Sequence, residues 1–146
     1  MSFLTPGKKN LITDVKGLYI GNSENELINT GSTILTCEDR FIASYKVLGG
    51  APGTRETDLL EPDKLVEKID ALVLSGGSAF GLEAASETVN LLRRNNKGYS
   101  VGNTKVPIVP SAIIFDLMNG GNKDWENNPY IDLAQKAYSD MSSNFK

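Results

Sequence analysis

The stretch that decides the fold is Ala71-Leu72-Val73-Leu74-Ser75-Gly76-Gly77-Ser78-Ala79-Phe80-Gly81-Leu82-Glu83-Ala84-Ala85. Its first four residues form a compact apolar run, which predicts a buried β-strand. After the glycines, the helical spacing of Ala85, Val89 and Leu92 predicts a helix that continues to about Arg94. A strand that turns through glycines into a helix points backbone N–H groups at whatever lies above the helix start. This geometry suits an anion or a developing oxyanion.

Three known chemical motifs can be compared with this turn, and none fits in full. A phosphate-binding P-loop closes on Gly-Lys-Ser/Thr, but here Gly81 is followed by Leu82, and the dinucleotide fingerprint G-x-G-x-x-G is absent. A nucleophile elbow needs G-x-S-x-G, and Phe80 stands where its second glycine belongs. A simpler alternative is that the glycines only let the strand and the helix pack closely. From the residues alone, both the anion-binding and the packing interpretation stay open.

The composition limits the chemistry. The 146 residues fit a single domain, or part of one, over 1–146. The 15 basic and 18 acidic residues give a net charge of -3, which does not favour binding to nucleic acid. The sequence contains no histidine. A Ser-His-Asp triad, Cys-His catalysis and a His-ligated metal site are therefore excluded. A general base would have to be a lysine, a carboxylate or an amine supplied elsewhere.

The single cysteine and the hydropathy pattern indicate the cellular compartment of the protein. Cys37 is the only cysteine, so no internal disulfide can form, and we expect it to be a buried strand residue. No segment approaches the roughly 18 apolar residues of a membrane span. The first seven residues lack the basic-then-apolar pattern of a signal peptide. We therefore expect a cytoplasmic protein with neither a membrane nor a nucleic-acid partner.

A hairpin, a loop and a short helix are expected between residue 33 and the central stretch. Residues 33–37 and 41–47 are β-branched and aromatic, and the short gap Glu38-Asp39-Arg40 predicts an antiparallel hairpin between them. The glycine-rich segment 49–57 predicts a loop, and Pro62 predicts the start of a short helix with Leu65, Val66 and Ile69 on its apolar face.

Two further elements are expected after it. Residues 106–115 are predicted to be extended, with the first half at an edge or in a loop because of Pro107 and Pro110. A last helix is predicted from about Pro129, with Asn128 as its cap.

Arg55 and Trp125 each allow two interpretations. An arginine in a glycine-rich loop can clamp a carboxylate or phosphate, but Arg55 can equally form a local ion pair with Glu56, Asp58 or Glu61. Trp125 can line a pocket or pack a loop, and we favour packing.

Three segments, in this order, carry a resemblance to a known family. They are residues 50–60 (Gly-Ala-Pro-Gly-Thr-Arg-Glu-Thr-Asp-Leu-Leu), residues 73–85 and residues 109–117 (Val-Pro-Ser-Ala-Ile-Ile-Phe-Asp-Leu). Together with the opening residues 10–22, they resemble the family of L-aminopeptidase/D-amidase, β-peptidyl aminopeptidases and nylon-oligomer hydrolases. The resemblance implies an α+β fold, the N-terminal part of a four-layer αββα sandwich.

The resemblance also implies a mechanism. Such a precursor cuts its own backbone before a Ser or Thr, which becomes the N-terminal nucleophile of a second chain and uses its own α-amine as base. This amide hydrolysis needs no histidine, metal or cofactor. In the family the nucleophile lies downstream of the helix that is predicted here to start near Pro129. We therefore expect this chain to be the N-terminal part of an aminopeptidase or amidase, inactive alone and with no catalytic residue of its own.

Five residues are candidates for substrate binding. In the family, the segment matching Ser111–Asp116 runs beside the active site, so Ser111, Ile113 and Phe115 are expected to be pocket walls. Some aminopeptidase members place a Glu, which holds the free amine of the substrate, where this chain has Ile113. Arg55 and Ser78 are further candidates. The expected partners are a small peptide or amide substrate, the C-terminal portion or second chain of the same precursor, and further copies of the protein.

Two hypotheses of other classes remain. The chain could be a non-catalytic scaffold or binding subunit that has lost the reactive half of the fold. It could also bind a phosphate-bearing ligand at the turn formed by residues 76–81.

Overall fold

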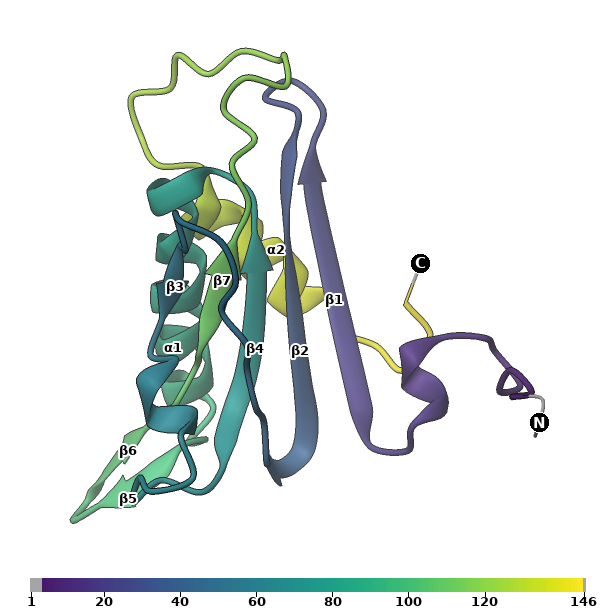
Figure 1. The fold of residues 1–146 in the computed structure, drawn as a ribbon, viewed down its shortest axis with the longest axis vertical. Helices are drawn as coiled ribbons and strands as arrows, with labels where there is room; N and C mark the ends of the chain where they lie inside the picture. Colours follow the sequence, from purple (N-terminus) through teal and green to yellow (C-terminus); the bar gives the residue numbers. More distant parts are fainter. Residues whose placement is uncertain (1–3, 146) are drawn as a thin grey trace.

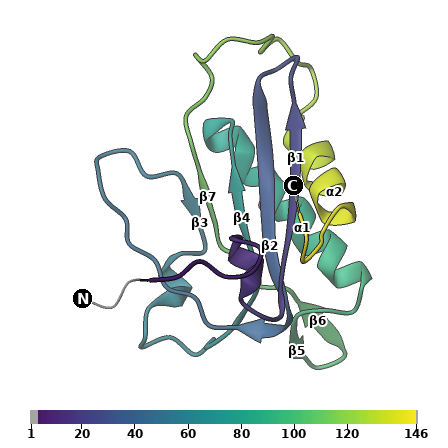
Figure 2. The same ribbon diagram turned by 90° about the vertical axis from the view of Figure 1, so that its right-hand side faces the viewer.

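The computed structural model describes residues 4–145 and has two layers, a five-stranded sheet and two helices that cover one of its faces (Figures 1 and 2). The strand order is β1-β2-β4-β7-β3, with β4 and β7 parallel and the other neighbours antiparallel. The strands are β1 (Leu18–Asn25), β2 (Thr30–Phe41), β3 (Thr54–Arg55), β4 (Ile69–Ser75) and β7 (Ser111–Ile113), and the helices are α1 (Glu83–Arg94) and α2 (Tyr130–Ser139). The predicted α+β class is confirmed.

Short elements complete the chain. They are the 3-10 helices η1 (Ile12–Asp14), η2 (Asp58–Leu60) and η3 (Ser78–Leu82), and a separate hairpin of β5 (Tyr99–Val101) and β6 (Thr104–Val106). The sequence did not predict this hairpin, which projects beyond one end of the main sheet (Figure 1).

The predicted hairpin between residues 33–37 and 41–47 is wrong. β2 pairs with β1 on one side, with Ile20 opposite Leu35, and with β4 on the other, and the turn between β1 and β2 is at residues 26–29. Glu38, Asp39 and Arg40 lie inside the long strand β2 instead of turning the chain. The physical reason is that the chain turns at residues 26–29, where Asn29 takes up φ 50°, and the strand that leaves this turn then continues through Glu38–Arg40.

The short helix predicted from Pro62 is also absent. Residues 61–68 are turns and coil, and Leu65 is 97% exposed. Ile69, which we assigned to the apolar face of that helix, is the buried first residue of β4. A helical spacing stabilises a helix only where the apolar face packs against something, and nothing lies beneath Leu65.

The central stretch and the last helix follow the prediction. Residues 71–74 lie in β4, and the chain then turns through η3 into α1, which ends at Arg94. α2 has Pro129 as its N-cap, so the predicted cap Asn128 lies one residue too early, although its side chain accepts the Tyr130 N–H at 2.9 Å. Pro107 and Pro110 lie between β6 and β7, outside any strand. Cys37 lies in β2 as expected but is half-buried, and this burial raises the pKa of its thiol.

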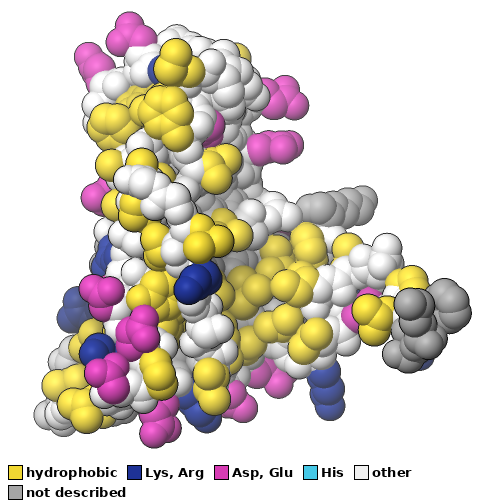
Figure 3. Space-filling model, viewed as in Figure 1, with side chains coloured by type: hydrophobic (Ala, Val, Ile, Leu, Met, Phe, Trp, Pro, Cys, Tyr) yellow, Lys and Arg dark blue, Asp and Glu magenta, His cyan; other side chains and the backbone are white. Residues whose placement is uncertain are grey.

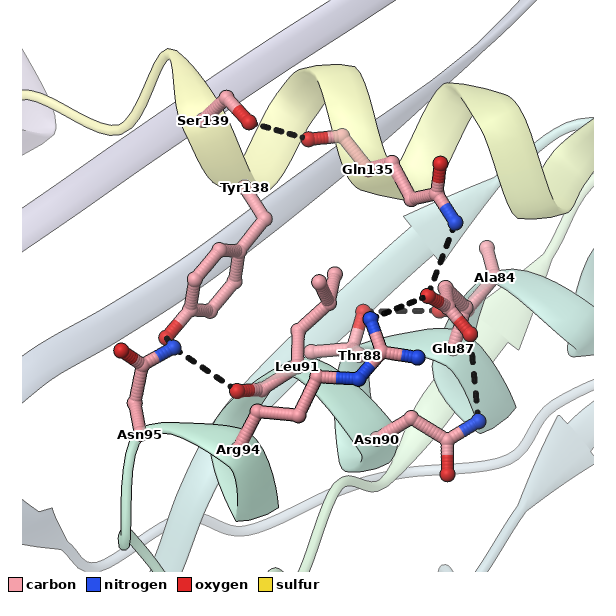
Figure 4. A network of polar contacts seen from close by, with 10 residues as sticks. All are labelled: Ala84, Glu87, Thr88, Asn90, Leu91, Arg94, Asn95, Gln135, Tyr138 and Ser139. Carbon is pink, nitrogen blue, oxygen red and sulfur yellow. Dashed lines mark hydrogen bonds and ion pairs between the residues drawn. The ribbon is translucent and has the colours of Figure 1, made fainter.

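The helix layer is held to the sheet by an apolar core and held together by a polar network. The core packs Ile34, Val73 and Val109 against Leu92 of α1 and Leu133 of α2. Between the helices, the buried Glu87 carboxylate accepts hydrogen bonds from Gln135 (3.0 Å) and Asn90 (3.1 Å) (Figure 4). Glu87 and Gln135 hold each other in place, because a buried carboxylate that loses its hydrogen-bond donors destabilises the fold. The network therefore fixes how α1 lies against α2.

The other face of the sheet is largely uncovered. Leu74 of β4 is 59% exposed and Ile114, just after β7, is 67% exposed, on the side facing away from the helices. Figure 3, seen from this side, shows hydrophobic side chains gathered along the face. We call this surface the open face, defined by Leu74, Ala112 and Ile114. A soluble domain rarely exposes a strand face of this kind unless something packs on it.

Candidate functional site

A concave surface lies at the sheet end where β4 and β7 finish and the β1–β2 turn begins. It is an open depression of about 780 Å³. Among its lining residues are Thr30, Gly31, Gly76, Ile114, Asp116 and Asn119. Strand ends and turns are where folds usually expose functional groups, because side chains from distant segments converge there.

A polar cluster behind this depression joins four separate segments. The buried carboxylate of Asp116 accepts the Gly77 N–H at 2.7 Å through Oδ1 and the Thr30 hydroxyl at 2.5 Å through Oδ2. The Thr30 hydroxyl lies 3.0 Å from the Tyr130 hydroxyl. We call Thr30, Gly76, Gly77, Asp116 and Tyr130 the Asp116 cluster. It links the start of β2, the turn after β4, the segment after β7 and the start of α2.

The chemistry of the groups sets the direction of these hydrogen bonds. An ionised carboxylate only accepts, so the single Thr30 proton goes to Asp116 and the Thr30 oxygen accepts from Tyr130. Burial raises the pKa of Tyr130, the Thr30 bond offsets part of this rise, and the negative charge of Asp116 adds to it. Tyr130 therefore stays protonated and donates.

The N–H groups of the glycine turn are already used inside the protein. The Gly76 N–H donates to the Gly31 carbonyl, the Gly77 N–H to Asp116 and the Ser78 N–H to the Ile114 carbonyl. The Asp116 carboxylate stands where a bound anion would have to be. This arrangement favours the packing interpretation of the turn over the anion-binding one, and it argues against a phosphate site there.

The glycines are needed for close packing on both sides. A Cβ at Gly76 would overlap the Asp116 carboxylate and the Thr30 hydroxyl. Gly77 has φ 85°, and a Cβ there would overlap the Tyr130 ring. Only glycine fits both demands, because it has no side chain and accepts a left-handed backbone.

The three expected wall residues lie along β7 and just beyond it, in different surroundings. Ser111 is buried, pairs in register with the core residue Val73, and its hydroxyl has no hydrogen-bond partner among residues 4–145. Ile113 is half-buried, packs close to Gly53 and borders a shallow hollow on the open face. Phe115 is 65% exposed. Because strand residues alternate, Ser111 and Ile113 point to the side of the sheet opposite Ala112 and Ile114, and Phe115 is exposed just beyond β7.

Arg55 and Ser78 lie at the edges of the same region. Arg55 in β3 donates to the Ser86 hydroxyl of α1 at 2.6 Å and is 3.9 Å from the Glu56 carboxylate. Its side chain therefore ties β3 to the helix layer. Ser78 starts η3 with φ 53°, and its N–H donates to the backbone carbonyl of Ile114.

Trp125 packs, as we favoured, and also borders a hollow. Its ring meets Phe80 and Tyr130 edge-on, with centroids 6.0 Å and 6.4 Å apart. With Phe80 and Leu117 it lines a depression of about 400 Å³. Trp125 thereby joins η3 and α2 to the loop of residues 117–129.

Residues 4–145 contain no grouping of three or more His, Cys, Asp or Glu side chains arranged to hold a metal ion. Within the same range, no helix has the length and apolar character needed to cross a bilayer.

Sequence reasoning missed the Asp116 cluster. Thr30 and Asp116 are 86 positions apart, and Thr30 and Tyr130 are 100 apart. The one available signal was an aspartate directly after the apolar run 112–115. Nothing local shows that this carboxylate turns back onto the glycine turn.

Comparison with known proteins gives one family. The family model of peptidase family S58 matches residues 10–143. Uncharacterized aminopeptidases of Mycobacterium tuberculosis and Mycobacterium bovis are each 39% identical over 136 residues, which is 88% of this chain and 39% of each relative. The chain therefore spans about two fifths of the length of the curated relatives it matches.

Solved structures share the fold. A Burkholderia sp. beta-aminopeptidase matches with a TM-score of 0.67 at 16% identity, over 100% of this chain and 42% of that one. The L-aminopeptidase D-Ala-esterase/amidase of Ochrobactrum anthropi, described as a variant of the Ntn hydrolase fold, matches with a TM-score of 0.68 at 17% identity, over 99% and 44%. At these identities the likeness shows the fold alone.

Proposed function

Because this chain belongs to peptidase family S58, we propose that it is the N-terminal part of a self-processing peptide or amide hydrolase of the aminopeptidase or amidase type. The nucleophile comes from a C-terminal portion outside these 146 residues, and the chain alone is inactive. The observation that carries the proposal is the family match over residues 10–143, together with the 39% share of each relative that the chain covers.

The open face supports the need for a second portion. Leu74 and Ile114 are more than half exposed on the side of the sheet opposite the helices. Burying an aliphatic side chain of this size contributes about 1.5–3 kcal/mol, so a covering layer would be strongly stabilised by this face. In the proposed enzyme that layer is the C-terminal portion, which would complete a four-layer αββα sandwich.

The residues at the end of β7 indicate where the substrate would bind. Ile113 is the last residue of β7, and Phe115, two residues later, is 65% exposed. An exposed aromatic side chain next to a covering layer can form the wall of a pocket between the two. We propose that Ile113 and Phe115 contact a small peptide or amide substrate, with Ser111, Arg55 and Ser78 as further candidate binding residues. The aliphatic Ile113 offers no charge to a substrate amine.

The mechanism we propose needs no histidine. A precursor cut before a Ser or Thr leaves that residue with a free α-amine, which can take the proton of its own hydroxyl as the nucleophile attacks the amide. This agrees with a chain that has no histidine. We further propose that the processed protein is cytoplasmic and assembles into a homo-oligomer.

The test is an intact mass and an N-terminal sequence for every species in the protein purified from its complete gene. The expected result is two chains, the second beginning with Ser or Thr. Replacing that residue with Ala should leave the precursor uncut. A single uncut species with the unsubstituted sequence would refute self-processing and favour the non-catalytic scaffold.

A further inference from the structure

We call Ile114 and Phe115, the two residues after β7, the rim, and the Asp116 cluster follows this rim directly in the chain. The ladder between β4 and β7 ends where the Ile114 N–H donates to the Ser75 carbonyl at 2.9 Å. Two residues later, the Asp116 side chain bonds back to the turn that follows β4. Phe115 stands between these two attachments. The backbone that carries Phe115 is thus fixed on both sides to the same turn.

The Asp116 attachment is restrained because its carboxylate is buried and bonded to two donors. Asp116 is 7% exposed and Tyr130 is fully buried. The lack of a side chain at Gly76 lets the carboxylate and the Thr30 hydroxyl meet against the backbone. Two donors on one buried carboxylate leave it a single well-defined orientation, because turning it would strand a donor.

We propose that Asp116 is a positioning residue of the hydrolase, which holds Phe115 as a fixed wall that selects substrates by the size of their side chain. This inference rests on the proposed function. Asp116 itself touches no substrate in this scheme. It acts through the Ile114–Phe115 rim, so its loss should change which substrates are preferred and not only how much enzyme is folded.

The informative variant is Asp116→Asn, which keeps the shape of the side chain. An amide offers N–H groups where the carboxylate accepts, so it cannot receive both the Gly77 N–H and the Thr30 proton. Thr30 would have to reverse its hydroxyl, and Tyr130 would lose its acceptor. Asp124→Asn is the matched control, because Asp124 is exposed on the loop that follows and its side chain is far less constrained.

The measurement is the ratio of kcat/KM for phenylalanine p-nitroanilide to that for alanine p-nitroanilide, with the complete processed protein. A smaller folded fraction lowers both values equally and leaves the ratio unchanged. We expect Asp116→Asn to change the ratio by about fivefold or more, a modest share of what one pocket contact can discriminate. Asp124→Asn should leave it unchanged, and Phe115→Ala should also shift it.

Each other outcome has a distinct meaning. An unchanged ratio in Asp116→Asn, while Phe115→Ala shifts it, would overturn the positioning role and leave the proposed function standing. Failure of the unsubstituted protein to cleave any amino-acid anilide or amide would overturn the proposed function, and this inference with it. Where Asp116→Asn does not fold, Thr30→Val removes one of the two donors to Asp116. An unchanged ratio in that variant would equally overturn the role.

Discussion

Replacing Gly77 with Ala should destabilise the protein by about 2–5 kcal/mol. A left-handed backbone costs an L-residue about 1–2 kcal/mol, and Gly77 has φ 85°. Its Cβ would also overlap the buried Tyr130 ring, and forcing an atom into a packed site costs about 1–3 kcal/mol. The backbone cost and the steric cost together give the expected range.

Gly49→Ala separates the two contributions. Gly49 has φ 90°, and its Cβ would meet nothing within 4 Å. Gly49→Ala therefore has the free-energy cost of a left-handed backbone but no steric overlap. The loss of chain entropy in the unfolded state is the same for both substitutions, so it cancels in the comparison. The difference between the variants, about 1–3 kcal/mol, measures the packing of Tyr130 against the turn.

Urea unfolding followed by the fluorescence of Trp125, the only tryptophan of the chain, measures both free energies of unfolding. Its ring contacts Tyr130, so the signal reports the affected region. If the two variants agree within about 0.5 kcal/mol, the usual spread of harmless substitutions, the reasoning about the Gly77–Tyr130 contact is refuted.

Three further predictions concern other parts of the molecule. Glu87→Ala should lower the free energy of unfolding by about 2–4 kcal/mol in a urea titration, because the side chains of Gln135, Asn90 and Arg94 lose their shared acceptor, whereas exposed Glu83→Ala should stay within about 0.5 kcal/mol. The raised pKa of Tyr130 means that the folded state holds this proton more tightly, so stability should fall as the pH rises above 10, and Tyr130→Phe should flatten part of that fall in pH-dependent unfolding. Leu74→Asp on the open face should weaken association with the proposed C-terminal portion by at least about tenfold in a co-purification titration, whereas Leu65→Asp on an exposed loop should not; equal binding by both would contradict the proposed covering layer.

The sequence by itself determined the features that depend on neighbouring residues. The apolar run 71–74, the glycine turn and the helix ending at Arg94 could all be predicted, because each rests on a local pattern that tertiary contacts reinforce. The start of the last helix near Pro129 followed from the same kind of local signal. The absence of histidine limited the chemistry, and the three ordered segments indicated the family that the comparison then showed.

Strand pairing and burial were decided only by the tertiary structure. The partners of β2 are β1 and β4 and not the segment after Arg40, because pairing depends on which turns the backbone makes and which faces the helices cover. Leu65 has helical spacing but nothing to pack against, and so forms no helix. The Asp116 cluster unites residues 86 and 100 positions apart, a closeness that exists only after the sheet and α2 have come together. Hydrogen bonds over such separations leave no periodic trace in the sequence, since each partner alone resembles an ordinary polar residue.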